Sequence, residues 1–126
     1  MFNISNNRIV TMNKGDSIKV PLFINAGDET ELIRYILQEG DKLYFSVMEP
    51  NAPFECGVIR KILTKDDLNA YGDAVVKLGL NDTQYLQSGI YYYEAKLVKQ
   101  PENTSIIGSE FDSFTVIPRT KFVIND

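Results

Sequence analysis

The segment GIYYYEAKLVK, residues 89–99, sets three consecutive tyrosines directly after a glycine. Neighbouring side chains of a β-strand point to opposite faces, so Tyr91 and Tyr93 lie on one face and Tyr92 lies on the other. The face of Tyr91 and Tyr93 continues into an alanine and a leucine, which predicts a core-facing side for this strand. The three tyrosines therefore cannot form one stacking platform for a ligand.

The same alternation recurs in both directions from this strand. It predicts further strands at residues 17–25, 42–49, 74–80 and 111–117. Residues 55–63 are also strand-like, with two faces of similar polarity. The residues expected to face inward are Ile18, Val20, Leu22, Ile24, Leu43, Phe45, Val47, Ala74, Val76, Leu78 and Leu80. Tyr44, Ser46 and Met48 are expected to face outward. Pro21 cannot donate a hydrogen bond to a neighbouring strand, so its strand is expected at a sheet edge or an irregularity.

Turn-forming residues separate these strands. Segments such as NKGDS, EGDK and KQPENTS concentrate Gly, Pro, Asn and Asp, and their spacing predicts an all-β sandwich or barrel. Thr64 is placed to cap a single helical turn at the start of TKDDLNAY. The segment DETELIRYIL, residues 28–37, contains helix-forming residues but is expected to be a loop leading into a short strand.

Length and composition indicate a single domain covering residues 1–126. The chain is 44% hydrophobic and 24% charged, which is typical of one compact globular domain. Its amino terminus lacks the pattern of a signal peptide, and no apolar run approaches the roughly 18 residues of a membrane span. The chain is therefore expected to be soluble and made in the cytosol, with no membrane partner. The single cysteine, Cys56, cannot form an intrachain disulfide.

The charge pattern argues against a nucleic-acid partner. The formal net charge is −4, and the 13 basic residues are scattered along the sequence. Affinity for nucleic acid depends mainly on clustered Lys and Arg. We therefore expect no nucleic-acid binding.

The inventory of reactive side chains predicts a protein that is not an enzyme. The chain has no histidine, so the commonest general base and the commonest zinc ligand are both absent. Cys56 alone cannot build a thiolate metal site, and a packing role is expected for it. Asp66 and Asp67 are expected to be solvated turn or helix-start charges, since the acid spacing of a calcium-binding EF-hand is missing. We expect no catalytic residue, no cofactor and no metal site.

The residues LQSGIY, which lead into the tyrosine run, have the spacing of a structural corner. Leu86, Gly89 and Tyr91 sit where immunoglobulin-like sandwiches place the corner before a central strand. There a tyrosine hydroxyl bonds the backbone a few residues upstream, and Tyr91 is expected to do so within the turn at residues 83–86. Tyr93 occupies the position where antibody domains carry a cysteine. The alternative is that the run reflects only the β-propensity of tyrosine.

Five segments carry a resemblance that spans nearly the whole chain: ISNNRIVTMNKGDSIKVPL, EGDKLYFSVMEP, IRKIL, LGLNDTQYLQSGIYYYEAKLV and FTVIPRTKFVIND. Together they resemble a family of small immunoglobulin-like β-sandwich proteins of tailed phages, related to baseplate and tail-fibre modules. The resemblance implies an antiparallel sandwich of about seven to nine strands, with at most one or two short helical turns. It also implies a non-enzymatic virion component that is assembled in the host cytoplasm. Such a component would attach to a head, neck or tail through strand edges and end loops, with other virion proteins and copies of itself as partners.

Outward-facing aromatic side chains are the candidate interface. Phe23, Tyr44 and Tyr92 would be unusual as a patch on a lone monomer, and such patches commonly mark interfaces. At least one of them is expected to contact a partner protein or another copy. The same residues would line the shallow site of a carbohydrate- or receptor-binding module, which is the alternative function. A small hydrolase that uses carboxylates is a weaker alternative.

Overall fold

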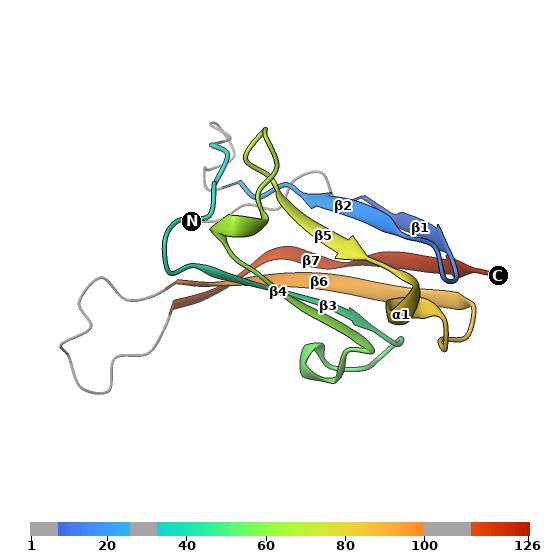
Figure 1. The fold of residues 1–126 in the computed structure, drawn as a ribbon. Coiled ribbons are helices and arrows are strands. Elements are labelled where there is room, and N and C mark those ends of the chain that lie inside the picture. Colours follow the sequence, from blue (N-terminus) through green and yellow to red (C-terminus); the bar gives the residue numbers. More distant parts are fainter. Residues whose placement is uncertain (1–7, 26–32, 100–111) are drawn as a thin grey trace.

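The computed structural model describes residues 8–25, 33–99 and 112–126, and within them seven strands form two sheets. The strands are β1 (Val10–Asn13), β2 (Ile18–Leu22), β3 (Lys42–Met48), β4 (Ile59–Leu63), β5 (Ala74–Leu78), β6 (Gly89–Lys99) and β7 (Asp112–Asn125). The larger sheet has the order β1-β7-β6-β3-β4, and the smaller one pairs β2 with β5. The two sheets lie face to face with the core between them (Figure 1). The all-β sandwich predicted from the sequence is confirmed.

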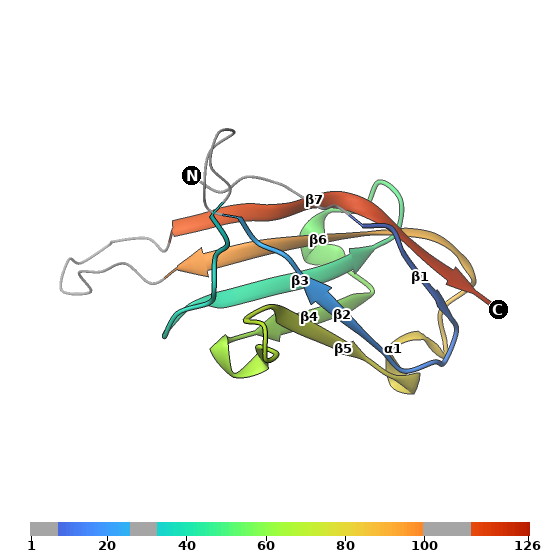
Figure 2. The same ribbon diagram turned by 90° about the horizontal axis from the view of Figure 1, so that it is seen from above.

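Strand β6 lies inside the larger sheet, between β7 and β3 (Figure 2). Its inward residues follow the predicted alternation, because Tyr91, Tyr93, Ala95 and Leu97 are all buried. The ring of Tyr93 contacts Phe45 of β3 at 5.7 Å between centroids and Phe122 of β7 at 6.3 Å. Such aromatic pairs stabilise by about 0.5–1.5 kcal/mol beyond their buried area. Tyr93 therefore lies within the core, between aromatic side chains of the two neighbouring strands.

One strand pair departs from the antiparallel pattern. β1 runs parallel to β7, with Val10 opposite Phe122 and Asn13 opposite Asn125. The turn after β1 contains Gly15 at φ +84°, a left-handed conformation that glycine adopts without strain. Through this turn the chain leaves the larger sheet and enters β2 of the smaller one. The chain thus crosses between the sheets at the edge of the sandwich.

The predicted inward residues of β2, β3 and β5 are correct except at Leu80, and two side chains of β3 that were expected outward are buried. Ser46 and Met48 were expected to face solvent but are buried, because residues 49–58 fold over the outer face of β3. Ser46 Oγ donates a hydrogen bond of 2.8 Å to the carbonyl of Phe54 in that segment. Leu80 was expected inward but is 54% exposed, since the chain leaves β5 and begins α1 (Leu80–Thr83) there.

Among the described residues three single helical turns connect the strands, one more than the resemblance implied. The predicted turn is η2 (Lys65–Asp67), where Thr64 Oγ1 accepts from the Asp66 amide and the Asp67 carboxylate accepts from the Thr64 amide. The other two are η1 (Phe54–Cys56) and α1, neither of which has a side-chain cap from its N-cap residue. Part of the segment at residues 28–37 lies outside the described residues. Its described part forms a single bridge, between Arg34 and Asn25.

The corner before β6 has the expected kind of hydrogen bond with a different acceptor. Tyr91 Oη donates to the carbonyl of Gln87 at 2.7 Å, just beyond the turn at residues 83–86 that was expected to accept it. That turn is closed by its own backbone, since the Leu86 amide donates to the Thr83 carbonyl. Leu86 packs against the core, and Gly89 begins β6 at φ +150°. Burial raises the pKa of Tyr91, so its hydroxyl stays protonated and donates at neutral pH.

We predict that Tyr91→Phe destabilises the fold more than Tyr92→Phe. Removing the Tyr91 hydroxyl leaves the Gln87 carbonyl without this donor, at a cost of roughly 1–3 kcal/mol. Tyr92 lies on the opposite face and its hydroxyl donates no hydrogen bond within the described residues. Each ~1 kcal/mol moves the melting midpoint by roughly 3–6 °C in a domain of this size. Thermal melts measure the midpoints of both variants, and the midpoint of Tyr91→Phe should be the lower one. Equal midpoints would contradict the corner assignment.

We also predict that Gly57→Ala is destabilising, for a steric reason. A Cβ at Gly57 would lie 1.9 Å from Ser46 Oγ and 3.0 Å from the Val47 carbonyl oxygen, so residues 49–58 would have to move off β3. Forcing extra atoms into such a contact costs roughly 1–3 kcal/mol. Gly79→Ala is the control, because a Cβ there meets only Ser17 Oγ at an ordinary 3.9 Å. Urea unfolding measures the free energy of unfolding of the two variants. An equal decrease for Gly57→Ala and Gly79→Ala would contradict close packing at Gly57.

Candidate functional site: a groove between two sheet edges

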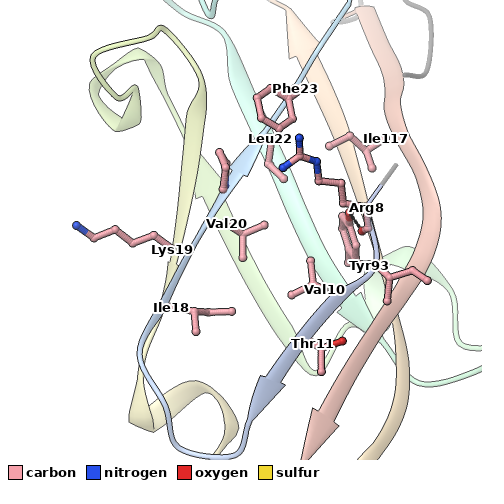
Figure 3. Close-up of a pocket in the computed structure, with 12 residues that line it drawn as sticks. Arg8, Val10, Thr11, Ile18, Lys19, Val20, Leu22, Phe23, Tyr93 and Ile117 are labelled. Carbon is pink, nitrogen blue, oxygen red and sulfur yellow. Dashed lines mark hydrogen bonds between the residues drawn. The ribbon is translucent and has the colours of Figure 1, made fainter. Parts of the chain in front are cut away.

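A groove opens where β1 of the larger sheet and β2 of the smaller sheet diverge from their shared turn (Figure 3). Its cavity has a volume of about 310 Å³. The lining residues are Arg8, Ile9, Val10, Thr11, Ile18, Lys19, Val20, Pro21, Leu22, Phe23, Tyr93 and Ile117. Most of them are apolar, and none is acidic. A concave apolar surface on a sandwich of this size is the default candidate for a binding site.

Both walls of the groove are strands that pair on one side only within the described residues. β2 pairs with β5 and has no other neighbour among the described strands, as predicted for the strand that contains Pro21. β1 likewise pairs with β7 alone. An unpaired edge presents backbone N–H and C=O groups that another strand can use. Pro21 weakens this edge, because proline offers no N–H to an added strand.

The amino-terminal end of the groove is held by Tyr93 of β6. Its hydroxyl donates to the carbonyl of Arg8 at 2.5 Å, across 85 residues of sequence. Burial raises the pKa of Tyr93, and the hydrogen bond to the Arg8 backbone opposes that shift only in part. A buried, protonated hydroxyl thus fixes the backbone just before β1. The wall that β1 forms therefore depends on the core strand.

Arg8 is the cation that reaches into the groove. Its guanidinium lies 4.9 Å from the centre of the Phe23 ring, a cation–π contact of about 0.5–1 kcal/mol at an exposed site. Within the described part of the chain it has no carboxylate partner and donates no hydrogen bond, so its N–H groups are free to bind a ligand. Lys19 also borders the groove, but its side chain points away from it (Figure 3).

The structure separates the three residues of the candidate interface. Phe23 lies at the groove, whereas Tyr44 and Tyr92 lie on the outer face of the larger sheet. On that face Tyr44 is opposite Lys96 and Tyr92 is opposite Met48, so the two tyrosines are in different rows. All three side chains are half-buried. They do not form one continuous patch, and their contact with a partner remains a prediction.

The groove itself was not identified from the sequence. Its lining combines residues near the amino terminus with Tyr93 and Ile117, and only the folded chain brings these together. One signal was present in the sequence, the proline within a strand, and by itself it does not indicate a groove. The 62% exposure of Ile9 is evident only in the folded chain.

The basic residues, scattered along the sequence, are partly gathered in space. The outer face of the larger sheet carries Lys42, Arg60, Lys96, Arg119 and Lys121. Glu94 lies among them and faces Lys96 at 3.9 Å and Arg119 at 3.6 Å. Lys96 also lies 4.7 Å from the centre of the Phe54 ring. This face is therefore positive although the whole chain has a net charge of −4.

The remaining acidic and cysteine side chains of the described residues are not gathered into a metal-binding cluster. Within residues 8–25, 33–99 and 112–126, no three His, Cys, Asp or Glu side chains are grouped as metal ligands would be. Cys56 is exposed rather than packed. Asp67 caps η2, in agreement with the expected helix-start role.

In the described part of the chain no helix has the length and apolar character needed to cross a membrane.

The buried carboxylates serve the fold at the end of the sandwich away from α1. Asp41 accepts hydrogen bonds from the Tyr35 hydroxyl and from the Gln38 amide, and Asp73 forms an ion pair with Arg34. These contacts hold residues 33–41 and the turn before β5 in place.

No protein-family model, curated protein or solved structure matches this chain.

Proposed function

We propose that the protein is a non-enzymatic attachment module of a phage particle and binds its partner at the groove between β1 and β2. The groove carries this proposal, because it joins two strand edges that have no described neighbour to an apolar cavity of about 310 Å³. Attachment through strand edges is what the sequence resemblance implies. The proposal assigns the virion as the location of the protein, and other virion proteins as its partners.

The strand order supports the immunoglobulin-like part of this reading. The order β7-β6-β3-β4 corresponds to strands G, F, C and C′ of a variable-type domain, and β2-β5 corresponds to strands B and E. The Tyr91 hydroxyl bonds the backbone upstream of β6, which corresponds to strand F, as in a tyrosine corner. Strand A of such a domain would pair with β2 at the edge that has no described neighbour. That edge is the one that borders the groove.

A carbohydrate- or receptor-binding module finds less support. It was predicted to use Phe23, Tyr44 and Tyr92 together, yet Phe23 lies at the groove and the two tyrosines lie on another face. On that face Tyr44 lies opposite Ile62 and Lys96, and Tyr92 lies opposite Met48 and Lys121, while the Lys96 ammonium lies over the Phe54 ring. A flat aromatic platform for a sugar ring is therefore not formed by these residues.

The proposal predicts that the chain is present in purified particles. Phage particles from the organism that encodes the chain should contain it in a fixed ratio to the capsid protein across a density gradient, as measured by quantitative mass spectrometry. Ile9→Asp, which places a charge at the groove, should remove the chain from the particles. Ile62→Asp is the matched control, because Ile62 is similarly exposed at 57% on the outer face of β4. A chain abundant in lysate but absent from the particles would contradict the proposal.

A further inference from the structure

We infer that the groove binds an extended segment of the partner, with apolar side chains at alternate positions and a carboxylate that pairs with Arg8. This inference rests on the proposed attachment function and specifies the chemistry of the partner. The occupant is a strand-like peptide segment rather than a folded surface. Its three requirements, an extended backbone, apolar side chains at alternate positions and one negative charge, follow from separate features of the groove.

The extended backbone follows from the edge of β2. This edge has no described neighbour, so a segment alongside it can form main-chain hydrogen bonds, as in β-strand addition. Pro21, the fourth of the five residues of β2, has no N–H to donate and limits the number of these bonds. Backbone pairing alone is therefore weak here, and side chains must supply much of the affinity.

The apolar side chains follow from the shape of the cavity. Val10 from β1 and Val20 from β2 point into the space between the two strands (Figure 3). Leu22 and Ile117 extend this surface towards the open end. Every second side chain of an extended segment lies on one side, so the segment can direct its apolar residues into this space. Burial of apolar surface is the main source of affinity in such pockets.

The carboxylate follows from Arg8. Its guanidinium projects over the open end of the groove, where no acidic residue lines the cavity. A guanidinium can hold a carboxylate through two parallel N–H donors. The Phe23 ring lies against the guanidinium, which restricts its movement before a ligand binds. An acidic side chain at one end of the segment would complete this contact.

Fluorescence anisotropy with capped octapeptide pools tests the inference on the full-length chain. Each pool alternates Val, Ile or Leu with Ser or Thr, and one pool carries Glu at either end, a second Gln and a third Lys. The wild type should bind the Glu pool at least about fivefold more tightly than the Gln pool. Arg8→Glu should lose this preference and favour the Lys pool instead. Arg60→Glu, the same charge change on the outer face, should leave the preference for Glu intact.

Amide chemical shifts locate the bound peptide. Addition of the Glu pool should move the resonances of Val10, Thr11, Val20 and Leu22, and should leave those of Ile62 and Lys121 in place. Failure of the wild type to bind, equal affinity for all three pools, or equal effects of the Arg8 and Arg60 variants would overturn the inference.

Two other occupants are separate outcomes of the same experiments, and each would overturn the inference. A dimer in sedimentation that Arg8→Glu converts to a monomer would assign the groove to a second copy of the chain. Nuclear Overhauser contacts from residues 1–7 to Val20 or Leu22 in the free chain would assign it to the chain itself. Incorporation into particles is measured independently. A chain that enters particles but binds no peptide therefore overturns only this inference and leaves the proposed function standing.

Discussion

Burial of two tyrosine hydroxyls on β6 is the constraint on which the rest of the structure depends. Tyr91 and Tyr93 are 7% and 3% exposed, and a buried hydroxyl without a partner destabilises a fold by roughly 1–3 kcal/mol. Both hydroxyls donate to backbone carbonyls, one at Gln87 and the other at Arg8. The core strand therefore fixes the connection that precedes it and also the backbone that leads into β1.

The groove follows from this arrangement together with the small size of the second sheet. Two strands, β2 and β5, face a sheet of five described strands, and no described strand pairs with the edge of β2 beside the groove. Because Tyr93 holds the Arg8 backbone, β1 stays with β7 while the chain continues through the Gly15 turn into β2. The space between β1 and β2 is therefore a built part of the fold. Its apolar lining and its cation then define what it can bind.

Local patterns were sufficient to predict most strands and their inward faces. Alternation requires only that one face of a strand be buried, and this holds for β2, β5 and β6. It failed at Ser46 and Met48, where residues 49–58 cover the outer face as well. It failed again at Leu80, where a strand pattern runs into a helical turn. Thr64 was predicted correctly because its capping partners are within three residues.

Local sequence patterns could not predict the candidate site, because the residues that meet there are far apart in the sequence. Tyr93 and Arg8 are 85 residues apart, and no local pattern indicates which backbone carbonyl a buried hydroxyl will reach. The positive outer face has the same origin, since Arg60 and Lys121 share a surface only through strand pairing. Candidate residues chosen for their type, such as Tyr44 and Tyr92, were separated by the register of β3 and β6.

Amide hydrogen exchange on Tyr93→Phe is the measurement that tests most directly whether β6 holds the groove wall. The variant keeps the buried ring and removes only the donor to Arg8. The amides of β1 should exchange roughly tenfold faster relative to those of β3, because the lost hydrogen bond lowers the local opening energy of β1. Unchanged protection of β1, or an equal loss in β1 and β3, would contradict the account.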